Sequence, residues 1–388
     1  MEWKEVVLGE LVDIYDSKRI PLTSQEREKI KGDIPYYGAQ GIIDYINQFL
    51  FDGEYILIAE DGNNIKSRQE NIAQIAKGKF WVNNHAHILQ GKIEQNLLCY
   101  IINHTDISGY VTGSAQPKLN QANLLKIPIK IPVNLSDQRK IAGILSALDA
   151  KIENNNKINA NLEAQAQALF KSWFVDFTPF KDQPFVDSEL GPIPQGWKVG
   201  KLGDLGDIVG GSTPSKSKPE YYTTHGIAWL TPKDLSTSKA KFTSRGEIDI
   251  TDEGYNSTST KLMPRGSVLF SSRAPIGYLT IAKNEICTNQ GFKSLVPNGA
   301  GTGFIYYSLR HLTPQIENRA TGSTFKEASA TLMRSVETIV PPTSILNKFE
   351  ELLRPILQFQ EKKEKENQRL AALRDTLLPK LMSGEIKL

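Results

Sequence analysis

The chain repeats itself, and this internal repeat constrains its fold more than any other feature. The segment 3–14, WKEVVLGELVDI, returns as the segment 197–208, WKVGKLGDLGDI. Further matches follow in the same order along both halves, and they are Gly53 with Gly266, Asn84 with Asn289, Gly113-Ser114 with Gly322-Ser323, and Ile131-Pro132 with Val340-Pro341. This order indicates gene duplication, so we expect two similar globular domains. The stretches between the matches differ strongly. A common scaffold with two different recognition surfaces would have this pattern, and so would simple drift after duplication.

A long helix is expected after the first globular half. From residue 136 onward apolar residues recur with heptad spacing, and the expected seam consists of Ile141, Leu148, Asn155, Leu162 and Leu169. One polar residue in such a seam, here Asn155, fixes the register and the number of partner helices. At 1.5 Å per residue, a helix of about 38 residues spans roughly 57 Å, which is more than a small domain needs for its own core.

The second long helix is expected from residue 343 onward. Its seam consists of Leu346, Phe349, Leu353, Ile356, Leu370, Leu377 and Leu381. Pro355 lies inside this segment and predicts a kink or a restart, whereas Pro379 and Gly384 should end the helix. Both helices have apolar ends and a polar centre that contains asparagine. This shared pattern favours antiparallel packing of one helix on the other, with two independent surface helices as the alternative.

The globular halves contain short alternating or apolar runs that are broken by Gly, Pro, Asn and Asp, such as YILIAEDG and SVLFSSRAPIG. These runs predict strands and hairpins, and short helices are expected at 95–104 and 303–312. The fold class is therefore α+β, with a curved or barrel-like sheet in each half. We expect two similar globular domains separated by two long antiparallel coiled-coil-like helices, with a pseudo-two-fold internal repeat. The expected boundaries are 1–135 for the first globular domain, 136–178 for the first helix, 179–342 for a linker with the second globular domain, and 343–388 for the second helix.

Composition excludes several classes of protein. With 39% hydrophobic and 23% charged residues among 388, the chain should bury ordinary cores. It has no apolar run of membrane-spanning length, and its first residues carry no secretory signal. We therefore expect a cytoplasmic protein without membrane contact, in which Cys99 and Cys287 are reduced and buried. The net charge of only +3 means that contacts with DNA, if DNA is the ligand, must be local.

The sequence contains no recognisable catalytic, cofactor or metal motif. Pro341-Pro342 lacks the acidic and aromatic neighbours of a methyltransferase motif, and the segment 210–216, GGSTPSK, lacks the spacing of a phosphate-binding loop. His85 and His87 alternate on an expected strand, so they should point to opposite faces and form no metal pair. Glu60-Asp61 is attributed to a turn with Gly62. Together these observations favour a binding protein.

Several motifs occur in a specific joint order along nearly the whole chain. In the first half they are Trp3-Lys4 with Leu8-Gly9, the segment 113–118 (GSAQPK), the segment 136–141 (SDQRKI), Asn154-Asn155 and the segment 169–174 (LFKSWF). The linker 191–197 (GPIPQGW) and the ending 377–386 (LLPKLMSGEI) follow. In this order the chain resembles the specificity subunits of Type I restriction–modification enzymes. The second half departs from the pattern, because Phe325 stands where the first half has Gln116.

The resemblance implies that each globular half is a target-recognition domain and that the two domains bind the halves of an asymmetric, bipartite double-stranded DNA target. It implies two modification (methyltransferase) subunits as partners on the spacer helices, which bring S-adenosylmethionine. Restriction (translocase/nuclease) subunits, which use ATP and Mg, would join in the full enzyme. This chain itself would hold no cofactor and would direct methylation and restriction without catalysing either. A DNA-binding or interaction module outside restriction, such as a regulator, is the alternative.

Residue chemistry points to candidates for DNA contact. Base edges are bound by Arg, Lys, Asn and Gln, and phosphates are also bound by Ser and Thr. In the first half the candidates are Lys18, Arg19, Gln40, Asn63, Asn64, Lys66, Arg68, Asn83, Asn84, Ser114, Gln116 and Lys118. In the second half they are Ser212, Thr213, Lys216, Lys218, Lys233, Arg273, Asn289, Gln290, Ser323, Thr324 and Lys326. The repeated Asn84 and Asn289 are equally compatible with a role in turns.

Overall fold

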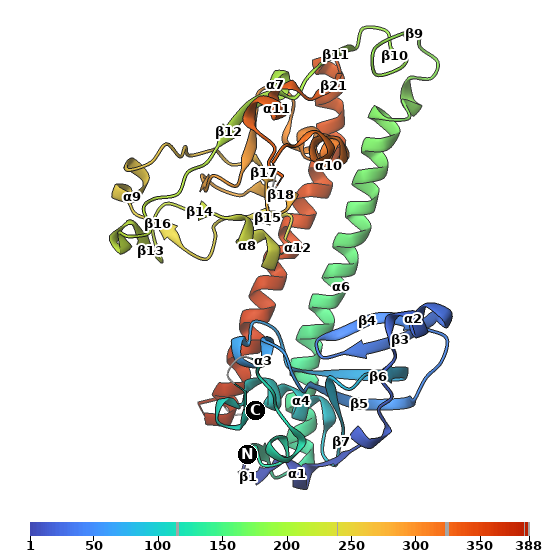
Figure 1. Ribbon diagram of the computed structural model, residues 1–388, viewed down its shortest axis with the longest axis vertical. Coiled ribbons are helices and arrows are strands. Elements are labelled where there is room, and N and C mark those ends of the chain that lie inside the picture. The colour runs from blue at the N-terminus through green and yellow to red at the C-terminus, as the bar shows by residue number, and fades with distance from the viewer. Residues whose placement is uncertain (114–115, 239, 323–325, 384, 387–388) are drawn as a thin grey trace. The chain divides into compact units, whose positions relative to one another are not determined.

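The computed structural model describes residues 1–388 apart from 114–115, 239, 323–325, 384 and 387–388 (Figure 1). The chain forms two compact units, one of residues 1–153 with 368–388 and the other of residues 154–367. Each unit combines a mixed sheet and short helices with parts of two long helices, α6 (Leu135–Phe174) and α12 (Thr343–Ser383). The expected α+β class, with two similar sheet-containing halves and two long helices, is confirmed.

A six-stranded sheet organises the first unit. Its strands, in spatial order, are β2 (Val12–Ile14), β7 (Ala86–Gly91), β5 (Phe51–Ala59), β6 (Ala73–Val82), β3 (Lys31–Gly38) and β4 (Gly41–Ile46). Strands β3 and β6 pair in parallel, whereas the other pairs are antiparallel. Strands β1 (Trp3–Val7) and β8 (Pro128–Pro132) form a separate antiparallel pair. The short helices are α1 (Leu8–Leu11), η1 (Asp16–Lys18), α2 (Ser24–Lys29), α3 (Asn64–Ser67), α4 (Gln95–His104), η2 (Ser108–Tyr110) and α5 (Gln121–Leu124).

The core of the first unit includes parts of both long helices. Buried side chains of β5 and of α4, such as Ile56 and Ile101, pack in one cluster with Ile141 of α6 and with Leu378 and Leu381 of α12. Helix α4 matches the expected range 95–104. Because the ends of α6 and α12 contribute to this core, they are integral to the unit and are not appended connectors.

The second unit contains a five-stranded sheet of β12 (Gly206–Gly210), β20 (Lys293–Pro297), β17 (Val268–Ser272), β18 (Ile276–Ala282) and β15 (Phe242–Thr243), in spatial order. Two-stranded pairs accompany it: β9 (Phe185–Val186) with β10 (Ile193–Pro194), β11 (Lys198–Lys201) with β21 (Glu337–Val340), β13 (Tyr222–Thr223) with β16 (Asp249–Ile250), and β14 (Trp229–Leu230) with β19 (Cys287–Thr288). The shorter helices are η3 (Thr178–Phe180), α7 (Leu202–Leu205), η4 (Pro219–Tyr221), α8 (Pro232–Thr237), α9 (Asp252–Asn256), α10 (Thr302–Arg319) and α11 (Ala330–Ser335). Helix α10 is longer than the expected 303–312.

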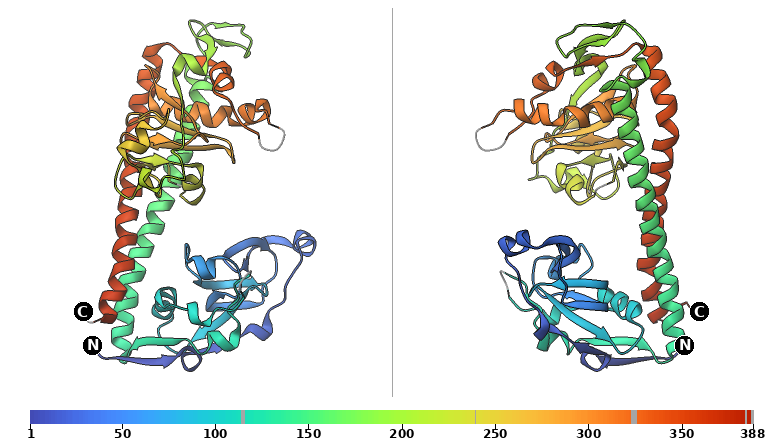
Figure 2. Two further views of the ribbon diagram at one scale, coloured as in Figure 1. Left: turned by 60° about the vertical axis from the view of Figure 1, so that its left-hand side comes forward. Right: turned by 90° about the vertical axis from the view of Figure 1, so that its right-hand side faces the viewer.

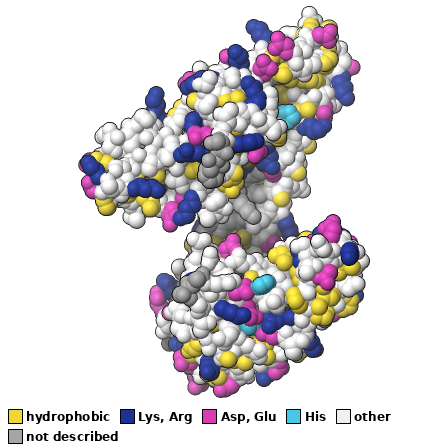
Figure 3. Space-filling view, viewed as in Figure 1, with side chains coloured by type: hydrophobic (Ala, Val, Ile, Leu, Met, Phe, Trp, Pro, Cys, Tyr) yellow, Lys and Arg dark blue, Asp and Glu magenta, His cyan; other side chains and the backbone are white. Residues whose placement is uncertain are grey.

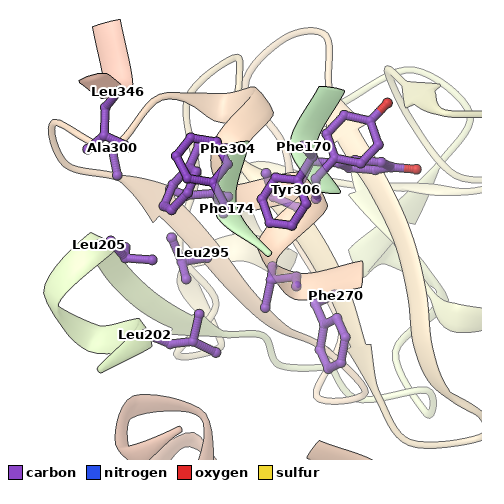
Figure 4. Close-up of a cluster of buried hydrophobic side chains, with 14 of the residues drawn as sticks. Phe170, Phe174, Leu202, Leu205, Phe270, Leu295, Ala300, Phe304, Tyr306 and Leu346 are labelled. Carbon is purple, nitrogen blue, oxygen red and sulfur yellow. The ribbon is translucent and has the colours of Figure 1, made fainter. Parts of the chain in front are cut away.

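Aromatic residues dominate the core of the second unit. Phe170 and Phe174 of α6 face Phe304 of α10 (Figure 4), and Phe174 also lies 4.8 Å from Phe349 of α12, ring centre to ring centre. Leu205 and Leu295 extend the same cluster toward the sheet. This packing joins the globular part of the unit to both long helices through one continuous core.

The sequence repeat corresponds to a repeat of strand pairing. In the first unit Lys4 pairs with Ile131 between β1 and β8, and in the second unit Lys198 pairs with Val340 between β11 and β21. Likewise Ile14 pairs with Leu89 between β2 and β7, and Ile208 pairs with Leu295 between β12 and β20. In both halves the pair that includes the last strand leads directly into a long helix.

Helices α6 and α12 run antiparallel within each unit, as both views in Figure 2 show. In the first unit Arg374 bonds Asp149, and in the second Asn155 donates to Asn367 at 2.9 Å. Gln360 donates to the backbone oxygen of Asn159 at 3.2 Å. Rising residue numbers in α6 therefore meet falling numbers in α12. The antiparallel packing expected from the two seams is present in both units.

The second long helix ends at Ser383, directly before Gly384, but neither of its two prolines interrupts it. Helix α12 is continuous through Pro355 and Pro379, so it neither restarts at the first proline nor ends at the second. Both prolines are exposed. Water can therefore bond the carbonyl groups that lose a helical partner, while the buried neighbours Leu353 and Leu378 hold the helix in place. Among the described helices, none combines the length and apolar character needed to span a membrane.

Candidate nucleic-acid interface

A cleft of about 800 Å³ in the second unit brings together six of the residues expected to contact DNA. They are Thr213, Lys216, Lys233, Arg273, Asn289 and Gln290. Tyr222 and Trp229 line the same cleft. Five of them lie in loops and Lys233 lies on α8, in segments that are far apart in sequence, so the fold brings them together.

Backbone and side-chain hydrogen bonds hold the loops around this cleft. The Trp229 indole donates to the backbone oxygen of Ser212 at 3.1 Å, and the Tyr222 hydroxyl donates to that of Pro214 at 2.6 Å. The Asn289 side-chain oxygen accepts the amide of Gly291 at 2.8 Å, which closes a turn. The Thr213 hydroxyl donates to the Gln290 side chain. The glycine-rich segment that contains Thr213 is thus tied to the strands opposite it.

The cationic side chains of the cleft are available near its surface. Lys216 is exposed, and Lys233 forms an exposed ion pair with Glu247 at 3.1 Å. Arg273 is 36% exposed and lies 3.3 Å from Glu327. Exposed pairs of this kind exchange partners at little cost, about 0–1 kcal/mol. On the face shown in Figure 3, basic and acidic side chains are intermixed on each unit, so local donors such as these would have to carry any DNA contact.

The corresponding part of the first unit is a buried charge cluster around Glu60. Glu60 follows β5 directly and lies 2.6 Å from Arg19 and 3.1 Å from Lys118. Arg19 also donates to the backbone oxygens of Asp16 at 3.0 Å and of Ala86 at 3.0 Å. Burial alone would raise the pKa of Glu60, but Arg19, Lys118 and nearby His87 outweigh burial and hold the pKa below its usual range.

Asp16, Glu60 and His87 lie close enough together to be compared with a metal site. Both ring nitrogens of His87 are already bonded, Nδ1 to the Asp16 carboxylate and Nε2 to the backbone oxygen of Leu119 at 2.7 Å. Arg19 contacts both carboxylates, at 3.5 Å for Asp16 and 2.6 Å for Glu60. Cations of the chain itself balance the charge of these carboxylates, so the cluster is better explained as an internal link between η1, β7 and the end of β5.

Replacing Glu60 by glutamine should make the stability of the protein less sensitive to acid. Because the folded-state pKa of Glu60 lies below its unfolded value, ionised Glu60 contributes stability above that unfolded value, and the contribution disappears as the pH falls through the folded-state pKa. At pH 7 the loss in Glu60→Gln should be roughly 1.5–3 kcal/mol, the range for hydrogen bonds to charged groups. Thermal unfolding measured between pH 7 and pH 4 should therefore show a shallower decline for the variant than for the unmodified protein.

Glu54→Gln is the matched control for this experiment. Glu54 lies on β5, which ends directly before Glu60, but it forms an exposed pair with Lys77 at 3.3 Å. Its substitution should leave the pH dependence unchanged. If the stability of Glu60→Gln and that of the unmodified protein declined equally with falling pH, the role assigned to Glu60 would be contradicted.

The other residues of the first unit that are expected to contact DNA differ in exposure. Lys18, Gln40, Asn63, Lys66, Asn84, Gln116 and Lys118 are exposed. Asn64 is buried and exchanges two hydrogen bonds with the backbone of Glu70, at 3.0 and 2.9 Å. Half-buried Arg68 donates to the backbone oxygens of Asn103 and Thr105. Buried Asn83 accepts the amide of His85 at 2.8 Å. These last three side chains already bond the protein, so DNA contact would require them to exchange partners.

The remaining expected contacts lie in the second unit or outside the described residues. Lys218 is exposed and donates to the Tyr221 hydroxyl at 3.0 Å, Lys326 is exposed, and Ser212 is half-buried. Ser114, Ser323 and Thr324 lie outside the described residues. Among the residues of the helix seam, Ile141, Asn155 and Leu353 are buried, and the half-buried ones are Leu148, Leu162, Leu169, Ile356, Leu370 and Leu377.

Sequence reasoning missed several residues that line or hold these sites. Trp229 and Tyr222 line the cleft but belong to none of the sequence patterns that predicted strands or contacts. Glu327 contacts both Arg273 and Lys293, at 3.3 and 3.2 Å, although it follows the segment used to match the two halves. Asp61 was considered only as a turn residue, although it lies 2.7 Å from His85. The candidate residue types were Arg, Lys, Asn, Gln, Ser and Thr, so acidic residues that pair with them, such as Glu327, were not among the candidates.

Comparison with known proteins agrees with this architecture. A model of the family described as Type I restriction modification DNA specificity domain matches residues 1–164 and 194–371. The Type I restriction enzyme MjaIX specificity subunit of Methanocaldococcus jannaschii is 36% identical over 187 residues, which are 47% of this chain and only 43% of that protein. A putative Type I specificity subunit of Haemophilus influenzae, S.HindORF215P, is 28% identical over 92% of this chain and 90% of that protein.

A solved structure has a similar fold. The crystal structure of the S subunit of a Type I restriction–modification system from M. genitalium covers 98% of this chain and 96% of its own, with a TM-score of 0.63 and 15% identity. The family model covers both sheet-containing halves and most of both long helices. The chain therefore belongs to the family of Type I restriction modification DNA specificity domains.

Proposed function

We propose that this chain is the specificity subunit of a Type I restriction–modification enzyme and binds a bipartite, asymmetric DNA target. The cleft of the second unit carries this proposal, because it collects base-contacting and phosphate-contacting residue types on loops that are held by hydrogen bonds. Arg273 and Gln290 have side chains that suit base edges, whereas Lys216 and Lys233 suit phosphates. The relatives are named specificity subunits, which favours this function over a regulator outside restriction.

The two halves would contact different sequences. The second unit offers Arg273 and two exposed lysines beside its cleft, whereas the first unit has Glu60 and Asp61 at the end of β5. Different hydrogen-bonding groups on a repeated scaffold suit an asymmetric target. The chain would contribute no catalytic residue. Two modification subunits would supply S-adenosylmethionine and methyl transfer, and restriction subunits would supply the chemistry that depends on ATP and Mg.

The decisive experiment is a map of methylated bases. Modification subunits would be expressed with and without the full chain in a host that lacks other adenine and cytosine methylation. We expect a split sequence motif that is methylated only when the chain is present. Methylation that does not depend on the chain, or a chain-dependent motif that is continuous and palindromic, would contradict the proposal.

Lys216→Gln should weaken DNA binding without changing sequence preference. If Lys216 contacts a phosphate, its removal lowers affinity about equally for target and non-target duplexes and reduces the salt slope of log K by about 1. Binding would be measured by titration of duplex DNA at several salt concentrations. Lys198→Gln is the control, since Lys198 is exposed on β11 and does not line the cleft. An unchanged salt slope in Lys216→Gln would exclude the phosphate contact.

A further inference from the structure

The end of β5 in the first unit and the end of β17 beside the cleft of the second unit have the same pattern of backbone hydrogen bonds, here called the backbone frame. In the first unit the amide of Glu60 donates to the oxygen of His85 at 2.9 Å, and the amide of Leu119 donates to the oxygen of Glu60 at 2.8 Å. In the second unit Ser272 occupies the place of Glu60. Its amide donates to the oxygen of Gly291 at 2.8 Å, and its own oxygen accepts the amide of Ala328 at 2.9 Å.

The turns next to this frame match as well. Asn83 and Asn289 each accept, through the side-chain oxygen, the amide of the residue two positions later, in both cases at 2.8 Å. The structural counterpart of Asn289 is therefore Asn83, and the match of Asn84 with Asn289 expected from the sequence is off by one residue. Thr112 forms an antiparallel bridge with Lys118, and Thr321 forms one with Glu327. The residue after the strand end is thus Asp61 in the first unit and Arg273 in the second.

The side chains on this common frame have opposite charge. Asp61 is 20% exposed and lies 2.7 Å from the half-exposed His85 ring. Arg273 is 36% exposed and lies 3.3 Å from Glu327. The return loop likewise contributes Lys118 in one unit and Glu327 in the other. The first unit therefore has a hydrogen-bond acceptor where the second has a donor, although the backbone hydrogen bonds of Glu60 and Ser272 follow the same pattern. The segments after the two residues differ, since Asp61 precedes Gly62 and Arg273 precedes a cis Ala274-Pro275 bond.

We propose that Asp61 and Arg273 are equivalent specificity-determining residues, one for each half of the DNA target. A carboxylate accepts a hydrogen bond from the exocyclic amino group of cytosine or adenine, whereas a guanidinium donates to O6 and N7 of guanine. Asp61 therefore selects an amino-bearing base in one half-target, and Arg273 selects guanine in the other. His85 and Glu327 are positioning residues that hold these two side chains when DNA is absent. The inference rests on the proposed DNA-binding function.

The position of Arg273 supports contact with DNA more than a purely structural ion pair. Arg273 lines the same cleft as Gln290 and Lys216, and its side chain is partly exposed there. Arg265 provides the contrast within the same unit. It forms a comparable pair with Glu361 at 2.8 Å, but it does not line the cleft. If both arginines were only structural, their removal would have similar consequences.

The test selects duplexes from a randomised library with the full chain assembled with its modification subunits. Asp61→Asn and Arg273→Gln are compared with the controls Asp52→Asn, an exposed residue of the same strand β5, and Arg265→Gln. We expect each test variant to lose preference at one base pair in one half-target by about 5- to 150-fold, and to retain the other half-target unchanged. The control variants should select the same target sequence as the unmodified protein. Unaltered selectivity in both folded test variants would overturn the inference.

Base analogues test the same contacts from the side of the DNA, by comparing the unmodified protein with each folded variant. The guanine whose selection is lost in Arg273→Gln is replaced by 7-deazaguanine, which lacks N7. This replacement should weaken DNA binding by the unmodified protein but not by Arg273→Gln. In the other half-target, a purine or pyrimidinone analogue without the exocyclic amino group should act in the same way through Asp61. If a base analogue weakened binding equally for the variant and the unmodified protein, the contact between that residue and that base would be excluded. If the unmodified protein selects no sequence at all, the proposed function itself fails, which is a different outcome.

Discussion

Lys241→Ala should destabilise the second unit by about 3–5 kcal/mol, the usual cost of removing one partner from a buried ion pair. Lys241 is only 8% exposed, and its ammonium group donates to Glu163 at 2.5 Å, to the Tyr307 hydroxyl at 2.6 Å and to Gln360 at 2.9 Å. The rings of Tyr306 and Tyr307 each lie 4.7 Å away. These partners belong to α6, α10 and α12, so one side chain connects the globular part of the unit with both long helices.

The electrostatics of this cluster explain the size of the effect. Burial lowers the pKa of Lys241 below its usual range despite the opposing influence of Glu163. Burial would raise the pKa of Glu163, but the charge and hydrogen bond of Lys241 outweigh it and hold the pKa low. Without Lys241, the remaining counter-ion of the Glu163 carboxylate among the described residues is the more distant Arg310, at 3.2 Å.

Chemical denaturation of three variants would check this prediction. Lys241→Ala should show the full loss, whereas the double variant Lys241→Met with Glu163→Gln should recover much of it, because no uncompensated charge remains buried. Lys233→Ala is the control, since its pair with Glu247 is about 70% exposed on both sides and should contribute about 0–1 kcal/mol. A loss in Lys241→Ala no larger than in this control would contradict the role of the buried cluster.

Phe349→Ala should cost about 3–5 kcal/mol of unfolding free energy, as is typical of a large aromatic side chain removed from a core. Phe349 is fully buried on α12. Its ring lies 4.8 Å from that of Phe174 and 5.8 Å from that of Trp173, both on α6. The cavity left by alanine would open in the core that joins the two helices to the globular part of the second unit.

Phe359 offers a matched control on the same helix. Its side chain is 42% exposed, and its ring contacts the Lys363 ammonium at 5.3 Å. Phe359→Ala should change the unfolding free energy by less than about 1 kcal/mol. Denaturant titration of both variants would separate the effect of burial from the effect of removing a phenylalanine. Similar losses of unfolding free energy in the two variants would contradict the core packing described at Phe349.

The repeat and the long helices follow from local patterns, and for this reason the sequence predicted them well. Heptad spacing depends only on neighbouring turns of one helix, so the expected ranges come within a few residues of α6 and α12. The effect of the prolines was misjudged because it depends on tertiary contacts. Exposed Pro355 and Pro379 are tolerated where the same helix buries Leu353 and Leu378 against α6 and the cores.

The candidate interface was predictable only as a set of residue types. Thr213, Lys233, Arg273 and Gln290 were chosen for their chemistry, and the tertiary structure alone placed them around one cleft. The same reasoning could not separate Asn84, which is exposed, from Asn83, whose side chain closes a turn. The side-chain amide of asparagine can close a turn or bind a base edge, so the residue type alone does not distinguish these two roles.

The sequence alone therefore established the duplicated scaffold, the two long helices and the family, because these depend on periodicity and on the order of motifs along the chain. Pairing across distant segments came only with the folded structure. The equivalence of Asp61 and Arg273 is the clearest case, since it rests on backbone hydrogen bonds to residues well removed in sequence, such as Leu119 and Ala328. Such contacts leave no pattern in the sequence, because the two partners lie in distant segments and meet only when the chain folds.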